Sequence, residues 1–225
     1  MMLTTAFAPL IGPLGFYPVL PDATWIARML AAGVRTVQLR CKTGSLPPEG
    51  IAAEVAAAVQ TSRNYPDAQL FINDHWQLAL ACGAYGIHLG QEDWAALPGD
   101  VRDTLRGSGL RLGLSTHTPD ELQLALAAAP SYVAIGPVYP TTLKKMPYAP
   151  VGLSQLPEWA ASAVRPAADG ALQKVPVVAI GGISLERLPG VLACGVDGVA
   201  VVSAITQAAD PDQAARTGLA LCRAL

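Results

Sequence analysis

Alternating cationic side chains follow one of the short apolar segments of this sequence. Residues 37–42 read Val-Gln-Leu-Arg-Cys-Lys. Because side chains alternate between the two faces of a strand, Gln38, Arg40 and Lys42 share one face. Inside a fold, the two cations Arg40 and Lys42 would need an anionic partner such as a phosphate. At a surface edge they would be ordinary solvated charges, and both interpretations remain open at this point.

Carboxylates follow the next two apolar segments. Asn73 and Asp74 end residues 70–74, and Asp93 comes shortly after residues 86–90. Two carboxylates at the ends of neighbouring strands can share a hard cation such as Mg²⁺, with phosphate oxygens and water as its other ligands. Alternatively, Asp74 and Asp93 only cap the helices that follow them. The neighbouring cationic segment favours the metal site.

Hydroxyls, glycines and lysines follow the later segments. The loop of residues 136–150 contains Thr141, Thr142 and Lys144, a composition typical of a lid that closes over a phosphate. Gly182 follows one apolar segment, and Val202 and Ser203 end the next. Glycine amides and a hydroxyl at the ends of consecutive strands match the usual phosphate site of α/β barrels.

Ser115 and the three histidines of the chain carry less information. Ser115 ends an apolar segment and could donate a hydrogen bond to a ligand, or simply end the strand. We interpret His88 and His117 as residues that orient loops or fill a rim, and His75 as structural. The residues together predict two anion sites, one cationic with a metal and one built from neutral donors. That arrangement indicates a two-substrate enzyme that makes or breaks a diphosphate ester.

Eight short apolar segments alternate with helical ones, and they must position these side chains. The expected strands are 16–20, 36–41, 70–74, 86–90, 111–115, 132–136, 177–181 and 199–204. The expected helices are 22–32, 47–63, 76–82, 119–128, 153–164, 185–193 and 210–223. The strand count and the absence of an early Gly-x-Gly-x-x-Gly favour a closed (β/α)₈ TIM barrel over an open, doubly wound sheet. Residues 165–174 are expected to form a surface loop without a functional role.

Helix boundary signals agree with this division. Asp22 and Asp210-Pro211 are typical helix starts, and Ser184 is expected to open the helix of residues 185–193. Gly33, Gly83 and Gly195 occupy positions typical of helix ends. We expect one domain over residues 1–225, with a short N-terminal extension of about 1–14 before the first strand.

Composition narrows the class of protein. Of the 225 residues, 52% are hydrophobic and 14% charged, with a formal net charge of −2, which argues against a nucleic-acid surface. The apolar runs are far shorter than the ~20 residues that cross a membrane, and the start lacks the pattern of a signal peptide. The four widely spaced cysteines predict reduced thiols in a cytoplasmic protein. A homodimer is possible.

The motifs in their order resemble those of the thiamine phosphate synthase family. The resemblance runs from about Tyr17 to Pro211, nearly the whole chain. It is carried by residues 38–42 (Gln-Leu-Arg-Cys-Lys), 72–74 (Ile-Asn-Asp), 86–93 (Gly-Ile-His-Leu-Gly-Gln-Glu-Asp), 113–117 (Gly-Leu-Ser-Thr-His), 136–141 (Gly-Pro-Val-Tyr-Pro-Thr), 179–183 (Ala-Ile-Gly-Gly-Ile) and 201–205 (Val-Val-Ser-Ala-Ile).

The resemblance implies a substrate pair and a reaction. The substrates would be 4-amino-2-methyl-5-hydroxymethylpyrimidine diphosphate and 4-methyl-5-(2-phosphoethyl)thiazole, and the products thiamine phosphate and diphosphate. The diphosphate would leave first, and the thiazole nitrogen would then capture the pyrimidine cation. Arg40, Lys42, Lys144 and Mg²⁺ on Asp74 and Asp93 would neutralise the departing charge. The substrate-positioning residues would be Gln38, Asn73 and Ser115 for the pyrimidine diphosphate, and Thr141, Gly182, Val202 and Ser203 for the thiazole phosphate.

One departure from the family pattern and three alternative functions stay open. Leu143 stands where family members often have a second threonine, so either Thr142 or the Leu143 backbone would replace it. A thiazole tautomerase would use a histidine such as His117 and needs no diphosphate pocket. A non-enzymatic barrel that binds thiamine precursors could do without the metal carboxylates. A phosphosugar isomerase or epimerase would need a carboxylate base within a strand, and none is obvious.

Overall fold

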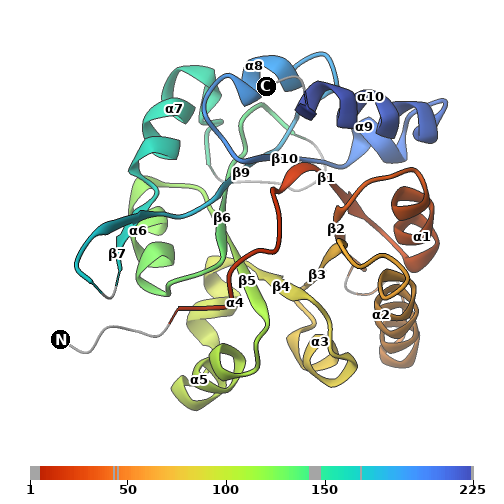
Figure 1. Cartoon of the computed structure of the whole chain (residues 1–225), viewed down its shortest axis with the longest axis horizontal. Helices are drawn as coiled ribbons and strands as arrows, with labels where there is room; N and C mark the ends of the chain where they lie inside the picture. Colours follow the sequence, from red (N-terminus) through yellow and green to blue (C-terminus); the bar gives the residue numbers. More distant parts are fainter. Residues whose placement is uncertain (1–5, 43, 45, 142–147, 168, 224–225) are drawn as a thin grey trace.

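Eight parallel strands close into a barrel (Figure 1). The computed structural model describes residues 6–42, 44, 46–141, 148–167 and 169–223. The last barrel strand pairs with the first, with Gly15 opposite Gly198, and this pairing removes both edges of the sheet. The predicted TIM barrel is therefore confirmed. The strands are, in their order around the barrel, β1 Gly15–Leu20, β2 Thr36–Leu39, β3 Gln69–Asn73, β4 Gly86–Leu89, β5 Arg111–Thr116, β6 Tyr132–Ile135, β9 Val177–Ile180 and β10 Gly198–Val201.

Helices surround the strands, as Figure 1 shows. Their apolar faces and the outward side chains of the strands form one continuous core. Within the described residues, no helix is long and apolar enough to cross a membrane. The helices are α1 Ala23–Ala31, α2 Pro48–Ser62, α3 Trp76–Cys82, α4 Gln91–Ala96, α5 Gly99–Gly107, α6 Pro119–Ala127, α7 Gly152–Ser162, α8 Leu188–Leu192, α9 Ser203–Thr206 and α10 Pro211–Arg223.

Most of the predicted helix boundaries are present. The Asp22 carboxylate accepts from the amide of Trp25 at 2.9 Å, and Asp210 accepts from the first-turn amides of α10. Gly33, Gly83 and Gly195 all have positive φ, the conformation that glycine adopts after helix ends. The prediction for Ser184 is wrong, because α8 begins only at Leu188 and Ser184 lies in the preceding turn.

Four other details differ from the sequence prediction. Residues 165–174 contain a hairpin rather than a plain loop, formed by β7 Val164–Pro166 and β8 Leu172–Lys174. The last barrel strand ends at Val201, because Ser203 already belongs to α9. Strand β2 ends at Leu39. The short helices α4 and α5 were not predicted.

A second, smaller core fills the inside of the barrel. Its apolar members include Tyr17, Phe71 and Tyr132, whose rings pack edge to face or tilted against one another. The alternation predicted for β2 is confirmed, because Val37 and Leu39 belong to the outer core while Gln38 bonds to Tyr17 inside the barrel. The inner core lies directly beneath the polar side chains at the strand ends.

Candidate active site

A cavity of about 390 Å³ opens at the carboxyl ends of the barrel strands. This is the end at which barrel enzymes place their active sites, because loops from all eight strands converge there. The sequence prediction named thirteen site residues, and ten of them line this one cavity. These are Gln38, Arg40, Asn73, Asp74, Asp93, Ser115, Thr141, Gly182, Val202 and Ser203.

Three predicted site residues are not placed in the cavity. Lys42 is exposed to solvent and is not one of the lining residues, whereas Arg40, two positions earlier, is. Thr142 and Lys144, with Leu143 between them, lie outside the described residues. The roles predicted for these three side chains therefore stay predictions.

Asp74 and Asp93 bring two carboxylates to the cavity from consecutive strand ends. Asp74 has φ of 62°, an uncommon left-handed conformation for a residue with a side chain. Its amide donates to the carbonyl of His88 at 3.1 Å, which ties the turn after β3 to β4. Neither carboxylate occupies a helix N-cap position, because α3 is capped at His75 and α4 at Gly90. The simple capping interpretation is therefore not supported.

The donor set of this corner suits Mg²⁺. Carboxylate oxygens are the ligands that this hard cation prefers, and it commonly takes only one or two of them beside phosphate oxygens and water. Among the described residues, no group of three or more His, Cys, Asp or Glu side chains is arranged to hold a metal. Asp74 and Asp93 would thus supply two ligands, and a bound phosphate and water would supply the rest.

A chain of buried hydrogen bonds crosses the barrel beneath the cavity. The Gln38 amide nitrogen donates to the Tyr17 hydroxyl at 3.0 Å, and the hydroxyls of Tyr17 and Tyr132 are 2.9 Å apart. His88 joins Tyr132 through Nδ1 at 2.7 Å and Ser115 through Nε2 at 2.8 Å. Gln38 and Ser115, two of the three residues predicted to position the pyrimidine diphosphate, are thus the two ends of one network.

Burial sets the protonation state of this network. It lowers the pKa of His88 to about 4, with a smaller contribution from the Arg40 charge, so the imidazole is neutral near pH 7. Burial also raises the pKa of the Tyr17 and Tyr132 hydroxyls above their ordinary value. The sequence analysis missed both tyrosines. The available signal was that Tyr17 and Val19 on one strand, and Tyr132 and Ala134 on another, share the inward parity.

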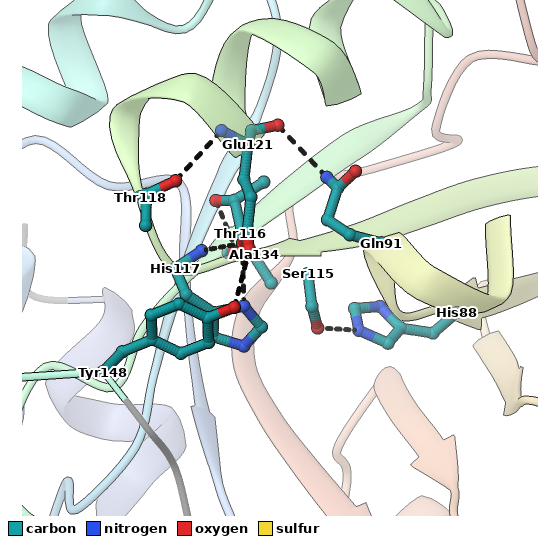
Figure 2. Close-up of polar contacts among 9 residues, drawn as sticks. All are labelled: His88, Gln91, Ser115, Thr116, His117, Thr118, Glu121, Ala134 and Tyr148. Atoms are coloured by element: carbon teal, nitrogen blue, oxygen red, sulfur yellow. Dashed lines mark hydrogen bonds and ion pairs between the residues drawn. The ribbon is translucent and has the colours of Figure 1, made fainter. Parts of the chain in front are cut away.

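His117 stands at the cavity rim, held between two neighbours, as Figure 2 shows. Its Nδ1 lies 2.8 Å from the Glu121 carboxylate, and its ring stacks on that of Tyr148 with centroids 4.8 Å apart. The Tyr148 hydroxyl donates to the other oxygen of Glu121 at 3.0 Å. Glu121 therefore orients the His117 ring and joins the start of α6 to the chain that leads into α7.

Glycines form the opposite side of the cavity, at the ends of β9 and β10. Gly182 has φ of 65°, and a Cβ there would lie 2.6 Å from the carbonyl oxygen of Pro140. Only glycine allows the turn after β9 and the loop after β6 to approach so closely. Arg187 fixes the same corner by donating to the Gly182 carbonyl at 2.6 Å and stacking on Tyr139. Thr141, Gly182 and Ser203 line the cavity together, so backbone amides and hydroxyls are available there to bind an anion.

The sequence is similar to one family of known proteins. A sequence model of the family described as thiamine monophosphate synthase matches residues 19–205. A thiamine-phosphate synthase of Salmonella schwarzengrund (strain CVM19633) is 54% identical over 197 residues, which cover 88% of this chain and 86% of that protein. One of Escherichia coli O6:H1 (strain CFT073) is 53% identical over 209 residues, with 93% and 92% coverage.

The fold is shared with a solved structure. Thiamine phosphate pyrophosphorylase from Pyrococcus furiosus superposes with a TM-score of 0.78 at 29% identity, covering 94% of this chain and 96% of that one.

Proposed function

Because the chain belongs to the thiamine monophosphate synthase family, we propose that it joins a pyrimidine diphosphate to a thiazole phosphate. Membership makes it an enzyme of the transferase class that acts on small molecules. The proposed substrates are 4-amino-2-methyl-5-hydroxymethylpyrimidine diphosphate and 4-methyl-5-(2-phosphoethyl)thiazole. The proposed products are thiamine phosphate and diphosphate.

The observation that carries this proposal is the division of one cavity into two unlike sides. Arg40, Asn73, Asp74 and Asp93 stand on the side of β2 to β4, while Gly182 and Ser203 stand on the side of β9 and β10. A cation and two carboxylates suit a diphosphate that carries a metal ion. Backbone amides and a hydroxyl suit a monophosphate. The two sides would hold the two substrates with their reacting atoms between them.

The reaction breaks one bond and forms one. The bond between the pyrimidine methylene carbon and the diphosphate oxygen breaks, and its electron pair leaves with the diphosphate. The thiazole nitrogen then gives its lone pair to the methylene carbon, so no proton transfer is needed. Arg40, with Lys42 and Lys144, would stabilise the charge that grows on the leaving group. Mg²⁺, held by Asp74 and Asp93, would add further positive charge at the same place.

A neutral His88 fits this assignment. A general acid or base usually has a pKa near the working pH, whereas burial moves the pKa of His88 far below it. We assign His88 to positioning through its bonds to Tyr132 and Ser115. The fixed ring of His117 could serve a tautomerase, but such an enzyme has no use for Arg40 and the two carboxylates in the same cavity.

Separate binding measurements on the two substrates test the division of the cavity. In calorimetric titrations, we expect the pyrimidine diphosphate to bind at least about tenfold more tightly with Mg²⁺ than with EDTA, about 1.4 kcal/mol. Asp93→Asn should remove that gain, and Asp100→Asn, a change in α5 away from the cavity lining, should keep it. Binding of the thiazole phosphate should not respond to the metal. Equal metal dependence for both substrates would contradict the two-sided cavity.

A further inference from the structure

The five-residue chain Gln38–Tyr17–Tyr132–His88–Ser115 has a direction that its chemistry determines. The four bonds are 3.0, 2.9, 2.7 and 2.8 Å long. Gln38, His88 and Ser115 line the cavity, whereas Tyr17 and Tyr132 lie beneath it, almost fully buried. Buried hydroxyls and imidazoles need a partner for every proton. The hydrogen bonds of this chain must therefore all be donated in the same direction, from one end to the other.

The direction follows from the donor at one end. The amide nitrogen of Gln38 can only donate, so the Tyr17 oxygen accepts. The proton of Tyr17 then goes to the Tyr132 oxygen, and the proton of Tyr132 goes to Nδ1 of His88. An accepting Nδ1 in a neutral imidazole leaves the ring proton on Nε2, which donates to the Ser115 oxygen.

This direction leaves opposite groups free at the two ends. Ser115 accepts from His88 and keeps its own proton, which it can donate into the cavity. Gln38 gives one of its two amide N–H groups to Tyr17, which fixes the amide and leaves its carbonyl oxygen, Oε1, to accept beside the second N–H. Were the chain reversed, Ser115 would donate to His88 and would offer a ligand only lone pairs.

We propose that Tyr17, Tyr132 and His88 are positioning residues that fix these proton directions, so that the cavity presents an acceptor at Gln38 and a donor at Ser115 to the pyrimidine. The proposal rests on the proposed function for the identity of the ligand. A 4-aminopyrimidine has an N–H donor beside a ring nitrogen acceptor, which complements this pair. The corresponding 4-oxo ring has an acceptor beside an N–H donor, and that N–H would oppose the Ser115 donor. The hydrogen-bond chain thus favours the 4-amino pyrimidine over the 4-oxo pyrimidine.

Packing holds the chain in place. Phe71 packs its ring against both Tyr17 and Tyr132. Gly113 on β5 faces the Tyr132 ring so closely that any Cβ there would overlap it. The strand therefore leaves space where the ring must lie for its hydroxyl to reach Tyr17 and His88.

The tautomer of His88 tests the direction without any substrate. In enzyme labelled with ¹⁵N-histidine, we expect His88 to carry its proton on Nε2, with Nδ1 unprotonated; the His88→Gln variant identifies its signals among the three histidines. Tyr132→Phe removes the donor to Nδ1 and should lose this single tautomer. Tyr85→Phe is a matched control, because Tyr85 also packs on Phe71 but bonds to Gln69 instead. A proton on Nδ1 in the unaltered enzyme would overturn the proposal.

Substrate discrimination tests the role in recognition. We expect kcat/KM to be at least about tenfold higher for the 4-amino than for the 4-oxo pyrimidine diphosphate, because the mismatch at Ser115 costs about tenfold or more. Tyr132→Phe should reduce this ratio about tenfold, and Tyr85→Phe should not change it. An unchanged ratio in a folded Tyr132→Phe enzyme would overturn the recognition role. Loss of turnover with every pyrimidine diphosphate would overturn the proposed function instead, while the His88 tautomer would still decide the direction of the chain.

Discussion

Arg40 and Lys42, two cations that follow β2, have different surroundings in this protein. Arg40 lines the cavity and Lys42, two residues later, is exposed. The guanidinium can hold a diphosphate with two parallel hydrogen bonds, and it stands beside the carboxylates that would hold the metal. A charge in contact with water is screened much more strongly.

Arg40→Gln and Lys42→Gln should therefore differ in their effect on catalysis. Arg40→Gln should lower kcat/KM for the pyrimidine diphosphate by about 100-fold or more, as for other groups that stabilise transition-state charge. Lys42→Gln should lower it by about tenfold at most. Steady-state kinetics of the two variants gives the comparison, and equal losses would mean that Lys42 reaches the diphosphate as Arg40 does.

His88 should make the stability of the protein depend on pH. Its pKa is about 4 in the fold and 6.5 when unfolded, so between these values the unfolded chain binds the extra proton. The stabilising contribution is present in full above pH 6.5 and is lost as the pH falls towards 4, to a total of about 3 kcal/mol. Urea unfolding of the metal-free protein from pH 7.5 to 4 measures this loss, and His88→Gln should lack it. If the free energy of unfolding fell equally with pH in the unaltered protein and in His88→Gln, the result would contradict a buried imidazole that stays neutral in the fold.

Residues were predictable where a local pattern determines their orientation. Period-two alternation in β2 correctly separates Gln38 from the outward Val37 and Leu39. Tyr17 and Tyr132 escaped detection because their hydroxyls meet across the barrel from positions 115 residues apart. No local pattern encodes that contact, since it exists only once the barrel has closed.

At the scale of elements, β5 and β6 pack closely where Gly113 lies opposite Tyr132, because the Tyr132 ring occupies the space that a side chain at position 113 would need. Gly113→Ala should push the Tyr132 ring from its place and lower the free energy of unfolding by about 2 kcal/mol, a typical cost of overpacking a core. It should also break the bond from Tyr132 to His88. Gly107→Ala is the matched control, because nothing lies within 4 Å of a Cβ at that position in α5. Thermal unfolding distinguishes them, and equal stability of both variants would contradict the close fit.

Element boundaries followed from the sequence where caps and glycines mark them, as at Asp22 and Gly83. The hairpin of β7 and β8 was not foreseen, because three-residue strands with exposed or half-buried side chains show no alternation of polarity. It stands at the amino-terminal ends of the strands, where Lys174 pairs with Asp197 just before β10. This is the end opposite the cavity, consistent with the predicted lack of a functional role for the hairpin.

At the scale of the whole molecule, barrel closure is what creates the site. The pairing of β1 with β10 brings Gln38, near the start of the chain, and Ser203, near its end, to one cavity. Eight strand signals and the residues that follow them predicted this closure and ten of the residues that line the cavity. Thr142 and Lys144 lie outside the described residues, so their roles rest on the sequence prediction.

The most direct test of the account is an assay of the purified enzyme with both substrates and Mg²⁺, in which thiamine phosphate and diphosphate are quantified together. We expect the two products in equal amounts, none when either substrate is omitted, and activity that EDTA removes and added Mg²⁺ restores. A folded enzyme that forms neither product with any divalent cation would contradict the proposed reaction. Full activity in EDTA would contradict the role assigned to Asp74 and Asp93.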